Sequence, residues 1–341
     1  MGILIRGAIV RRPVREKAVH GGQVKRCEEK TGGRWIDFSA SVNPVPPVTD
    51  WNLGAVGLAD YPDDRYDQLK EVIGREFRRD PAEIAVGNGS IELIRAFCTA
   101  ALDRGQQFYI EPPTFGEYAL SARIAGAEAA MNPQDAAARF ICHPNNPTGH
   151  LRPRSEIENA LRLCRRHETM LLLDEAFIEL ADPKASLVGC RDSHLFLVRS
   201  LTKSFAVPGV RFGYGFGDPE FIATIEAIRP PWSVNAFAEA VAVEAFRHYG
   251  ELETSRAYIR AERERLSKGL SDLGFTVEPS DANFLLTHTP VDAGFLCERL
   301  RSSFILVRDC SSFGLSSSIR VAIRTRDENN QLLEALSRCV P

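Results

Sequence analysis

The chain has 341 residues, of which 44% are hydrophobic and 26% are charged, with a formal net charge of −3. These values are typical of a globular protein with room for two domains, and they argue against a nucleic-acid-binding surface. No apolar run is long enough to span a membrane. The basic stretch from Arg6 to Lys17 lacks the apolar segment of a signal peptide.

The eight cysteines and seven histidines are scattered, without C-x-x-C or H-x-x-x-H pairs. This distribution favours reduced thiols and a cytoplasmic location over a disulfide framework, and it predicts no metal site.

The predicted elements begin with an N-terminal arm, residues 1–40, that packs with a small C-terminal domain. Prolines 44, 46 and 47 exclude a helix directly after the arm. Leu69, Val72, Ile73 and Phe77 have the spacing of one helix face, which predicts a helix beginning near Tyr61.

Apolar strands and helices then alternate. Strands are predicted at 84–86, 108–110, 140–142, 170–173, 195–198 and 213–217, and helices at 91–102, 115–124 and 154–166. Because the strands are continuously apolar, we expect a mostly parallel sheet covered by helices on both faces, in a large domain at 41–235.

The last third of the chain predicts a smaller α+β domain at 236–341. One long helix is expected from about Asn235 to Leu273. Short strands near Phe284, Ile305 and Ile319 and helices at 292–301 and 327–339 follow it.

Lys203 follows the apolar strand at 195–198, with Ser200, Thr202 and Arg211 close to it in sequence. The amine of Lys203 can form a Schiff base with an aldehyde, and the hydroxyls and the guanidinium can hold a phosphate. The alternative interpretation is a basic, solvated turn after a strand.

Five further residues have both a functional and a structural interpretation. Gly89 and Ser90 lie between a predicted strand and the N-terminus of a predicted helix. They form either an anion-binding site or a plain turn in which Ser90 is the N-cap. Asp174 is the last residue of a predicted buried strand. Its carboxylate either pairs with a cation, which a buried charge needs, or caps a neighbouring helix. Asn146 lies in a proline-rich turn that can present its amide or be simply a loop. Phe115 can stack on a cofactor ring or belong to the core.

The order of these pieces resembles the fold-type I enzymes that depend on pyridoxal 5'-phosphate, the aspartate aminotransferase superfamily. The resemblance covers about residues 36–325 and is most specific in PNNPTG (144–149), DEAF (174–177) and SLTKSFAVPGVRFGY (200–214). It implies an α/β fold with a mostly parallel central sheet between helices, a smaller α+β C-terminal domain and pyridoxal 5'-phosphate as cofactor.

The resemblance also implies roles for individual residues. Lys203 matches the Schiff-base lysine, Asp174 the partner of the pyridinium nitrogen, Asn146 the donor to the phenolic oxygen and Phe115 the stacking ring. Gly89, Ser90, Ser200 and Arg211 match the groups that hold the cofactor phosphate. Tyr61 matches a tyrosine that reaches this phosphate from a second subunit, which implies a homodimer with composite active sites.

Within the superfamily, the sequence resembles the histidinol-phosphate aminotransferase group and, more closely, the threonine-phosphate decarboxylases of cobalamin biosynthesis. The segments that carry this are His20-Gly21-Gly22, FSASVNP (38–44), RSLTKSFAVPG (199–209), PWSVNA (231–236), ILVRDC (305–310) and RVAIR (320–324). Phe177 departs from the aminotransferases, which generally have a tyrosine there that donates to the phenolic oxygen.

We therefore expect a carboxy-lyase that converts a small phosphorylated amino acid, L-threonine O-3-phosphate, to (R)-1-aminopropan-2-ol O-phosphate. The candidate ligands of the substrate anions are His20, Gly21, Gly22, Arg308, Arg320 and Arg324, although each arginine can also be a surface charge. Histidinol-phosphate aminotransferase is the alternative activity. A third interpretation is a cofactor-binding regulator or an inactive paralogue. Regulators of this superfamily usually carry a DNA-binding domain in front, for which the N-terminal arm is too short, and the presence of Lys203 and Asp174 disfavours an inactive paralogue.

Overall fold

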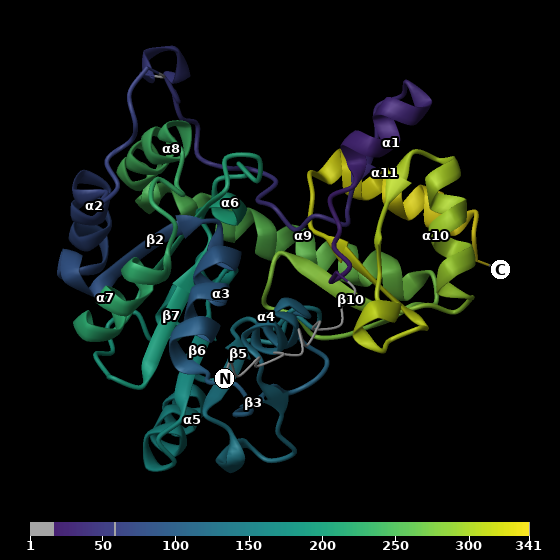
Figure 1. The fold of residues 1–341 in the computed structure, drawn as a ribbon. Coiled ribbons are helices and arrows are strands. Elements are labelled where there is room, and N and C mark those ends of the chain that lie inside the picture. Colours follow the sequence, from purple (N-terminus) through teal and green to yellow (C-terminus); the bar gives the residue numbers. More distant parts are fainter. Residues whose placement is uncertain (1–16, 58, 341) are drawn as a thin grey trace, which may run out of the picture.

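The computed structural model describes residues 17–57 and 59–340 (Figure 1). The basic stretch that begins at Arg6 lies outside these residues except for Lys17.

A seven-stranded sheet is the centre of the larger lobe. Its strand order is β2-β8-β7-β6-β5-β3-β4. The bounds are β2 Ile84–Asn88, β3 Gln107–Tyr109, β4 Glu128–Ala129, β5 Ala138–Cys142, β6 Met170–Asp174, β7 Leu195–Arg199 and β8 Phe212–Phe216. The neighbours from β7 to β4 pair in parallel, whereas β8 is antiparallel to both β2 and β7. The predicted mostly parallel sheet is confirmed.

Helices cover both faces of this sheet (Figure 1). One face packs against α2 (Asp67–Phe77), α5 (Arg154–Arg166) and α8 (Ala236–Arg247), and the other against α3 (Ser90–Ala101), α4 (Glu117–Ala125) and α7 (Pro219–Ile228). In β7, Leu195 and Leu197 join one hydrophobic cluster while Phe196 and Val198 join the other. Burial on both faces explains why the strand sequences are continuously apolar.

The smaller lobe contains the antiparallel sheet β12-β13-β10-β9. Its elements are α9 Leu252–Asp272, β9 Thr276–Val277, β10 Phe284–His288, α10 Ala293–Ser302, β11 Ile305–Leu306, β12 Arg308–Asp309, β13 Ser318–Ala322 and α11 Arg326–Ser337. Near the N-terminus, α1 (Val24–Thr31) is followed by β1 (Ile36–Asp37), which pairs in parallel with β11. Residues 24–37 therefore lie against the C-terminal lobe (Figure 1).

Two helix boundaries differ from the sequence expectation. The helix expected from Asn235 to Leu273 is divided into α8 and α9 by a short turn at Tyr249–Glu251. This turn contains Gly250, which is a poor helix former. The helix expected from Tyr61 begins only at Asp67, because Tyr66 has a left-handed backbone (φ 53°) that cannot continue a helix.

No described helix is both long and apolar enough to cross a bilayer. The described residues also contain no group of three or more His, Cys, Asp or Glu side chains arranged to hold a metal ion. All eight cysteines are free.

Candidate active site

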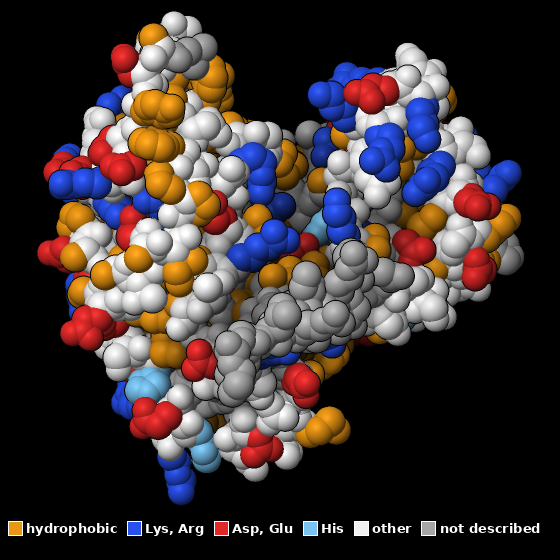
Figure 2. Space-filling model, viewed as in Figure 1, with side chains coloured by type: hydrophobic (Ala, Val, Ile, Leu, Met, Phe, Trp, Pro, Cys, Tyr) orange, Lys and Arg blue, Asp and Glu red, His pale blue; other side chains and the backbone are white. Residues whose placement is uncertain are grey.

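A cavity of about 840 Å³ lies where the carboxyl ends of the parallel strands face the C-terminal lobe. Figure 2 shows the molecule hollowed between its two lobes, with Lys and Arg side chains on both sides. Most of the residues singled out from the sequence line this cavity. They are His20, Gly21, Gly22, Ser90, Phe115, Asn146, Asp174, Ser200, Lys203, Arg211, Arg308 and Arg320.

Three of the expected site residues do not line the cavity. Gly89 lies next to it, since a Cβ atom there would be 2.4 Å from Nη2 of Arg211. Tyr61 is 79% exposed and stacks on Trp232 with 4.5 Å between ring centroids. Both rings lie on the surface of this chain, away from its own cavity.

Arg324 is the clearest departure from the expected site. Its guanidinium donates to the carbonyl of Asp37 at 3.2 Å and to Oε1 of Glu328 at 2.9 Å. Since Arg324 follows the end of β13 and pairs with a carboxylate in the first turn of α11, it joins the N-terminal segment to that helix. The structure does not support its expected role in binding substrate.

Lys203 belongs to the short helix α6 (Leu201–Ser204), directly after Ser200. No described residue hydrogen-bonds its amine. Burial, together with the nearby charges of Arg320 and Arg211, lowers the pKa of this amine to about 8, and the charge of Asp174 opposes this shift. Lys203 is therefore partly neutral near pH 8, which is the form that attacks an aldehyde.

Asp174, at the end of β6, is a buried carboxylate with two fixed partners. Its Oδ2 accepts from Oη of Tyr118 at 2.7 Å, and its Oδ1 accepts from the amide of Ala176 at 2.9 Å. Burial raises its pKa to about 6, against these two hydrogen bonds. A buried carboxylate with neutral partners is stabilised by a cation, such as a protonated pyridine nitrogen.

The start of α3 and the guanidinium of Arg211 form the anion-binding end of the cavity. The first turn of a helix presents free amides and a positive dipole end to an anion. The hydroxyls of Ser200 and Thr202, 2.7 Å apart, line the same cavity. The strand β8 passes so close that a Cβ atom at Gly213 would lie 2.2 Å from the amide nitrogen of Ser90.

These residues fit the pyridoxal 5'-phosphate expected from the sequence. The cavity offers an amine for the aldehyde, a buried carboxylate for the ring nitrogen and a helix terminus with a guanidinium for the phosphate. Oδ1 of Asn146 accepts from Nη1 of Arg320. The Asn146 amide nitrogen has no partner within the described part of the chain and remains available as a donor.

Phe177 lies beside Lys203. The lysine Nζ is 6.0 Å from the centroid of the Phe177 ring, which packs edge-on against Phe284 with 5.1 Å between centroids. The ring is buried and lines the cavity. The side of the site next to the lysine is therefore apolar.

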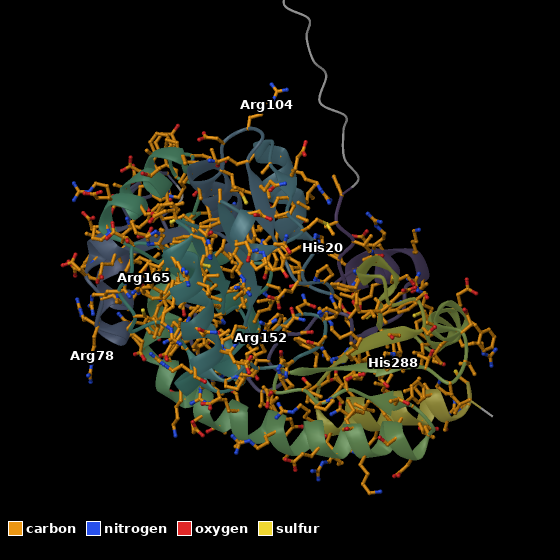
Figure 3. The ribbon with its side chains drawn as sticks, turned by 90° about the horizontal axis from the view of Figure 1, so that it is seen from below. His20, Arg78, Arg104, Arg152, Arg165 and His288 are labelled. Atoms are coloured by element: carbon orange, nitrogen blue, oxygen red, sulfur yellow. The ribbon has the colours of Figure 1, made fainter. Side chains whose placement is uncertain are left out.

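Further cationic groups lie toward the C-terminal lobe. Arg320 donates to Asn146 and, at 3.0 Å, to the carbonyl of Ser39, while its buried Nε has no partner in the described structure. Burial lowers the pKa of Arg320 to about 10. Arg308 is buried and donates to the carbonyl of Val19 at 2.7 Å. His20 lies at the boundary between the lobes (Figure 3).

Sequence reasoning missed Tyr118, Glu117 and Ser39, which contact Asp174, His20 and Arg320 respectively. The only signal for Tyr118 was its position three residues after Phe115, near the same helix start. Ser39 lies within the segment 38–44, but nothing in the sequence showed that its carbonyl faces Arg320.

The chain is similar to known proteins of two named activities. A protein of Caldanaerobacter subterraneus subsp. tengcongensis, provisionally named a threonine-phosphate decarboxylase, is 35% identical over 328 residues, covering 87% of this chain and 88% of that protein. Histidinol-phosphate aminotransferase 2 of Cupriavidus pinatubonensis is 33% identical over 336 residues, with 89% and 90% covered.

This chain is also similar to solved structures of a histidinol-phosphate aminotransferase and of a threonine-phosphate decarboxylase. The histidinol-phosphate aminotransferase from Clostridium acetobutylicum matches with a TM-score of 0.81 and 30% identity, over 89% of this chain and 98% of that one. The L-threonine-O-3-phosphate decarboxylase from Porphyromonas gingivalis matches with a TM-score of 0.74 and 25% identity, over 84% and 92%. Since the model of aminotransferase class I and II matches residues 36–336, the chain belongs to this family of enzymes, whose members bind pyridoxal 5'-phosphate.

Proposed function

We propose that this enzyme decarboxylates L-threonine O-3-phosphate to (R)-1-aminopropan-2-ol O-phosphate for cobalamin biosynthesis, as a cytoplasmic homodimer. The observation that carries the proposal is Phe177, an apolar ring beside Lys203 where the aminotransferases generally have a hydroxyl donor. The relative from Caldanaerobacter and the structure from Porphyromonas support the same substrate.

In this proposal, the protein groups bind, orient and move protons. When bound, pyridoxal 5'-phosphate supplies an aldehyde for the substrate amine and a conjugated ring that accepts the electron pair left at Cα. Asp174 provides the buried negative charge that keeps the ring nitrogen protonated. Lys203 is placed to give a proton to Cα after carbon dioxide has left.

The substrate has two anionic ends, a carboxylate and a phosphate. Arg320, Arg308 and His20 are the cationic groups that we propose to bind them. By fixing both ends they determine which bond at Cα stands perpendicular to the cofactor ring and breaks. The site favours decarboxylation if they hold the carboxylate perpendicular, and proton removal by Lys203 if they hold the Cα–H bond there.

The alternative is histidinol-phosphate aminotransferase with 2-oxoglutarate as acceptor. It is favoured by the relative from Cupriavidus and the structure from Clostridium. It needs the same cofactor residues and a phosphorylated amine, so the cofactor pocket alone does not separate the two reactions.

The deciding experiment incubates the cofactor-loaded enzyme with L-threonine O-3-phosphate, without a keto acid, and follows carbon dioxide. We expect steady release, and Lys203→Ala should lose both turnover and the visible absorbance of the bound cofactor. Amino transfer from histidinol phosphate to 2-oxoglutarate without carbon dioxide release would establish the alternative. An active, yellow Lys203→Ala protein would disprove the role of Lys203.

A further inference from the structure

Residues 18–22 cross the cavity from the side of the C-terminal lobe. The carbonyl of Val19 accepts from Nη2 of Arg308 at 2.7 Å, and the amide of Gly22 donates to Oγ of Ser39 at 2.9 Å. Gly21 lies so close to Ser39 that a Cβ atom there would be 2.3 Å from the Ser39 carbonyl oxygen. These contacts fix the position of His20 in the middle of the segment.

His20 makes the contact to the opposite wall. Its Nε2 lies 2.8 Å from Oε1 of Glu117, and its ring lies 5.8 Å from that of Phe115. Glu117 is in the first turn of α4 and is only 5% exposed. The hydrogen bond to His20 holds the pKa of Glu117 below its usual range, so this carboxylate is ionised at neutral pH.

A buried carboxylate at the edge of a cavity for anionic ligands needs an explanation, because it repels the anions that the cavity binds. The charge of Glu117 is opposed by His20 and by Arg95, whose Nη2 is 3.5 Å from Oε2. Arg308 also lines the cavity, but its guanidinium already donates to the carbonyls of Val19 and Asp309 and to Oγ of Ser312.

With Nε2 directed at Glu117, the free position of His20 is Nδ1, which has no partner among the described residues. Nδ1 can donate to an anion when the ring is an imidazolium. In the imidazolium form, Nε2 donates to the Glu117 carboxylate on one side of the ring while Nδ1 can donate to an anionic ligand on the other. This is how a carboxylate commonly fixes the orientation of a histidine that binds a ligand through its other nitrogen.

We propose that Glu117 is a positioning residue, which orients His20 so that Nδ1 binds the phosphate of the substrate. The inference rests on the proposed function only in requiring a phosphorylated amine as substrate. Glu117 itself does not touch the ligand; it determines the strength of the His20 contact.

The test measures the dissociation constants of O-phosphoethanolamine and ethanolamine by titrating the absorbance of the cofactor-loaded enzyme. Both ligands have an amine, neither has a carboxylate, and only the first has a phosphate. Glu117→Gln and His20→Ala should each raise the dissociation constant of O-phosphoethanolamine about ten- to hundredfold, which corresponds to the loss of one charge-assisted hydrogen bond. The dissociation constant of ethanolamine should not change. Glu117→Asp should retain part of the difference in affinity between O-phosphoethanolamine and ethanolamine.

A double-variant cycle separates positioning from an independent effect. If Glu117 acts through His20, Glu117→Gln should cause no further loss in a His20→Ala background. Glu156→Gln, which removes an exposed first-turn carboxylate from α5, is the matched control and should change nothing.

Equal losses for both ligands, or a full additional loss in the double variant, would overturn the inference. Because neither ligand can release carbon dioxide, the result does not depend on the reaction. A failure of the proposed decarboxylation would appear only in the carbon dioxide assay.

Discussion

At the scale of single residues, Asp174 is placed to bind a cationic ligand, and its burial lowers the stability of the protein without that ligand. Its pKa is raised to about 6 by burial, from an unperturbed value of 3.8. Since the folded state binds this proton more tightly than the unfolded state, the contribution of Asp174 to stability falls as the pH rises from about 4 through 6. Above pH 6 the ionised carboxylate destabilises the cofactor-free protein.

Asp174→Asn should therefore stabilise the cofactor-free enzyme at pH 8 by an amount on the order of 3 kcal/mol, with a smaller gain at pH 5. The same variant should bind pyridoxal 5'-phosphate more weakly, since its ring nitrogen loses the anionic partner. Urea unfolding of both proteins at the two pH values, and cofactor titration, provide the measurements. A variant that is less stable than the parent at pH 8 would contradict this account of Asp174.

Phe177→Tyr is the substitution that restores a hydroxyl donor beside Lys203. A donor to the phenolic oxygen of the cofactor stabilises its deprotonated form, so the pH midpoint of the cofactor's visible absorbance should fall by about one unit. Spectroscopic pH titration of the two loaded proteins measures the shift. Phe284→Tyr, which adds a hydroxyl to the neighbouring ring, is the comparison, and an equal shift there would show that the effect is not specific to residue 177.

Some residues of the site could be predicted from the sequence and others could not. Lys203 and Asp174 could be found because each directly follows an apolar strand, and strand ends meet at one edge of a parallel sheet. Tyr118 and Glu117 could not be found in this way, because their partners are far away in the sequence. The position of Arg324 outside the cavity lining could not be predicted, because a short strand followed by arginines does not show which guanidinium pairs with a nearby carboxylate.

At the scale of elements, the packing of β8 against the start of α3 shapes the anion-binding end of the cavity. Gly213 permits this approach, because a Cβ atom would be 2.2 Å from the Ser90 amide nitrogen and 2.6 Å from the carbonyl carbon of Gly89. These are backbone atoms, so the helix start itself would have to move.

Gly213→Ala should therefore weaken pyridoxal 5'-phosphate binding at least tenfold, because misplaced amides no longer reach the phosphate. Gly189→Ala is the matched control, since a Cβ atom there meets nothing within 4 Å. Cofactor affinity from absorbance titration and thermal unfolding of the cofactor-free proteins are the measurements. Unchanged affinity in Gly213→Ala would show that the tight approach of β8 does not shape the cofactor site.

Secondary structure near the sheet could be predicted because burial on both faces leaves continuous apolar runs. The antiparallel direction of β8 could not be predicted, since a run of apolar residues does not show in which direction the strand runs in the sheet. The break between α8 and α9 was also missed. Apolar residues continue on both sides of Gly250, and a single glycine does not by itself show that a helix ends.

At the scale of the whole molecule, the cavity is built from distant parts of the chain, from His20 in the N-terminal segment to Arg320 in β13. The pairing of β1 with β11 holds Ile36 and Asp37 against the C-terminal lobe, and the hydrogen bond from Arg308 to the carbonyl of Val19 holds the 18–22 segment beside the same lobe. This arrangement could be anticipated only through the family resemblance, since no local pattern identifies which distant segments meet.

Tyr61 is the one expected cofactor ligand that is remote from the cavity of its own chain, on a surface where it stacks on Trp232. In the proposed homodimer this surface faces the second subunit, and each cofactor site combines Tyr61 of one chain with Lys203 of the other. In a two-fold symmetric dimer, a subunit with Tyr61→Ala and a subunit with Lys203→Ala then form one site that carries both changes and one that carries neither.

A heterodimer of these two variants, isolated by two different affinity tags, should therefore recover about half of the wild-type turnover, although each parent homodimer is impaired. A heterodimer of Lys203→Ala with Asp174→Asn is the control. Both of those residues belong to the same chain's site, so both of its sites are damaged and no recovery is expected. A Tyr61→Ala/Lys203→Ala heterodimer with no more turnover than the mean of its two parents would show that Tyr61 does not complete the cofactor site of the second subunit.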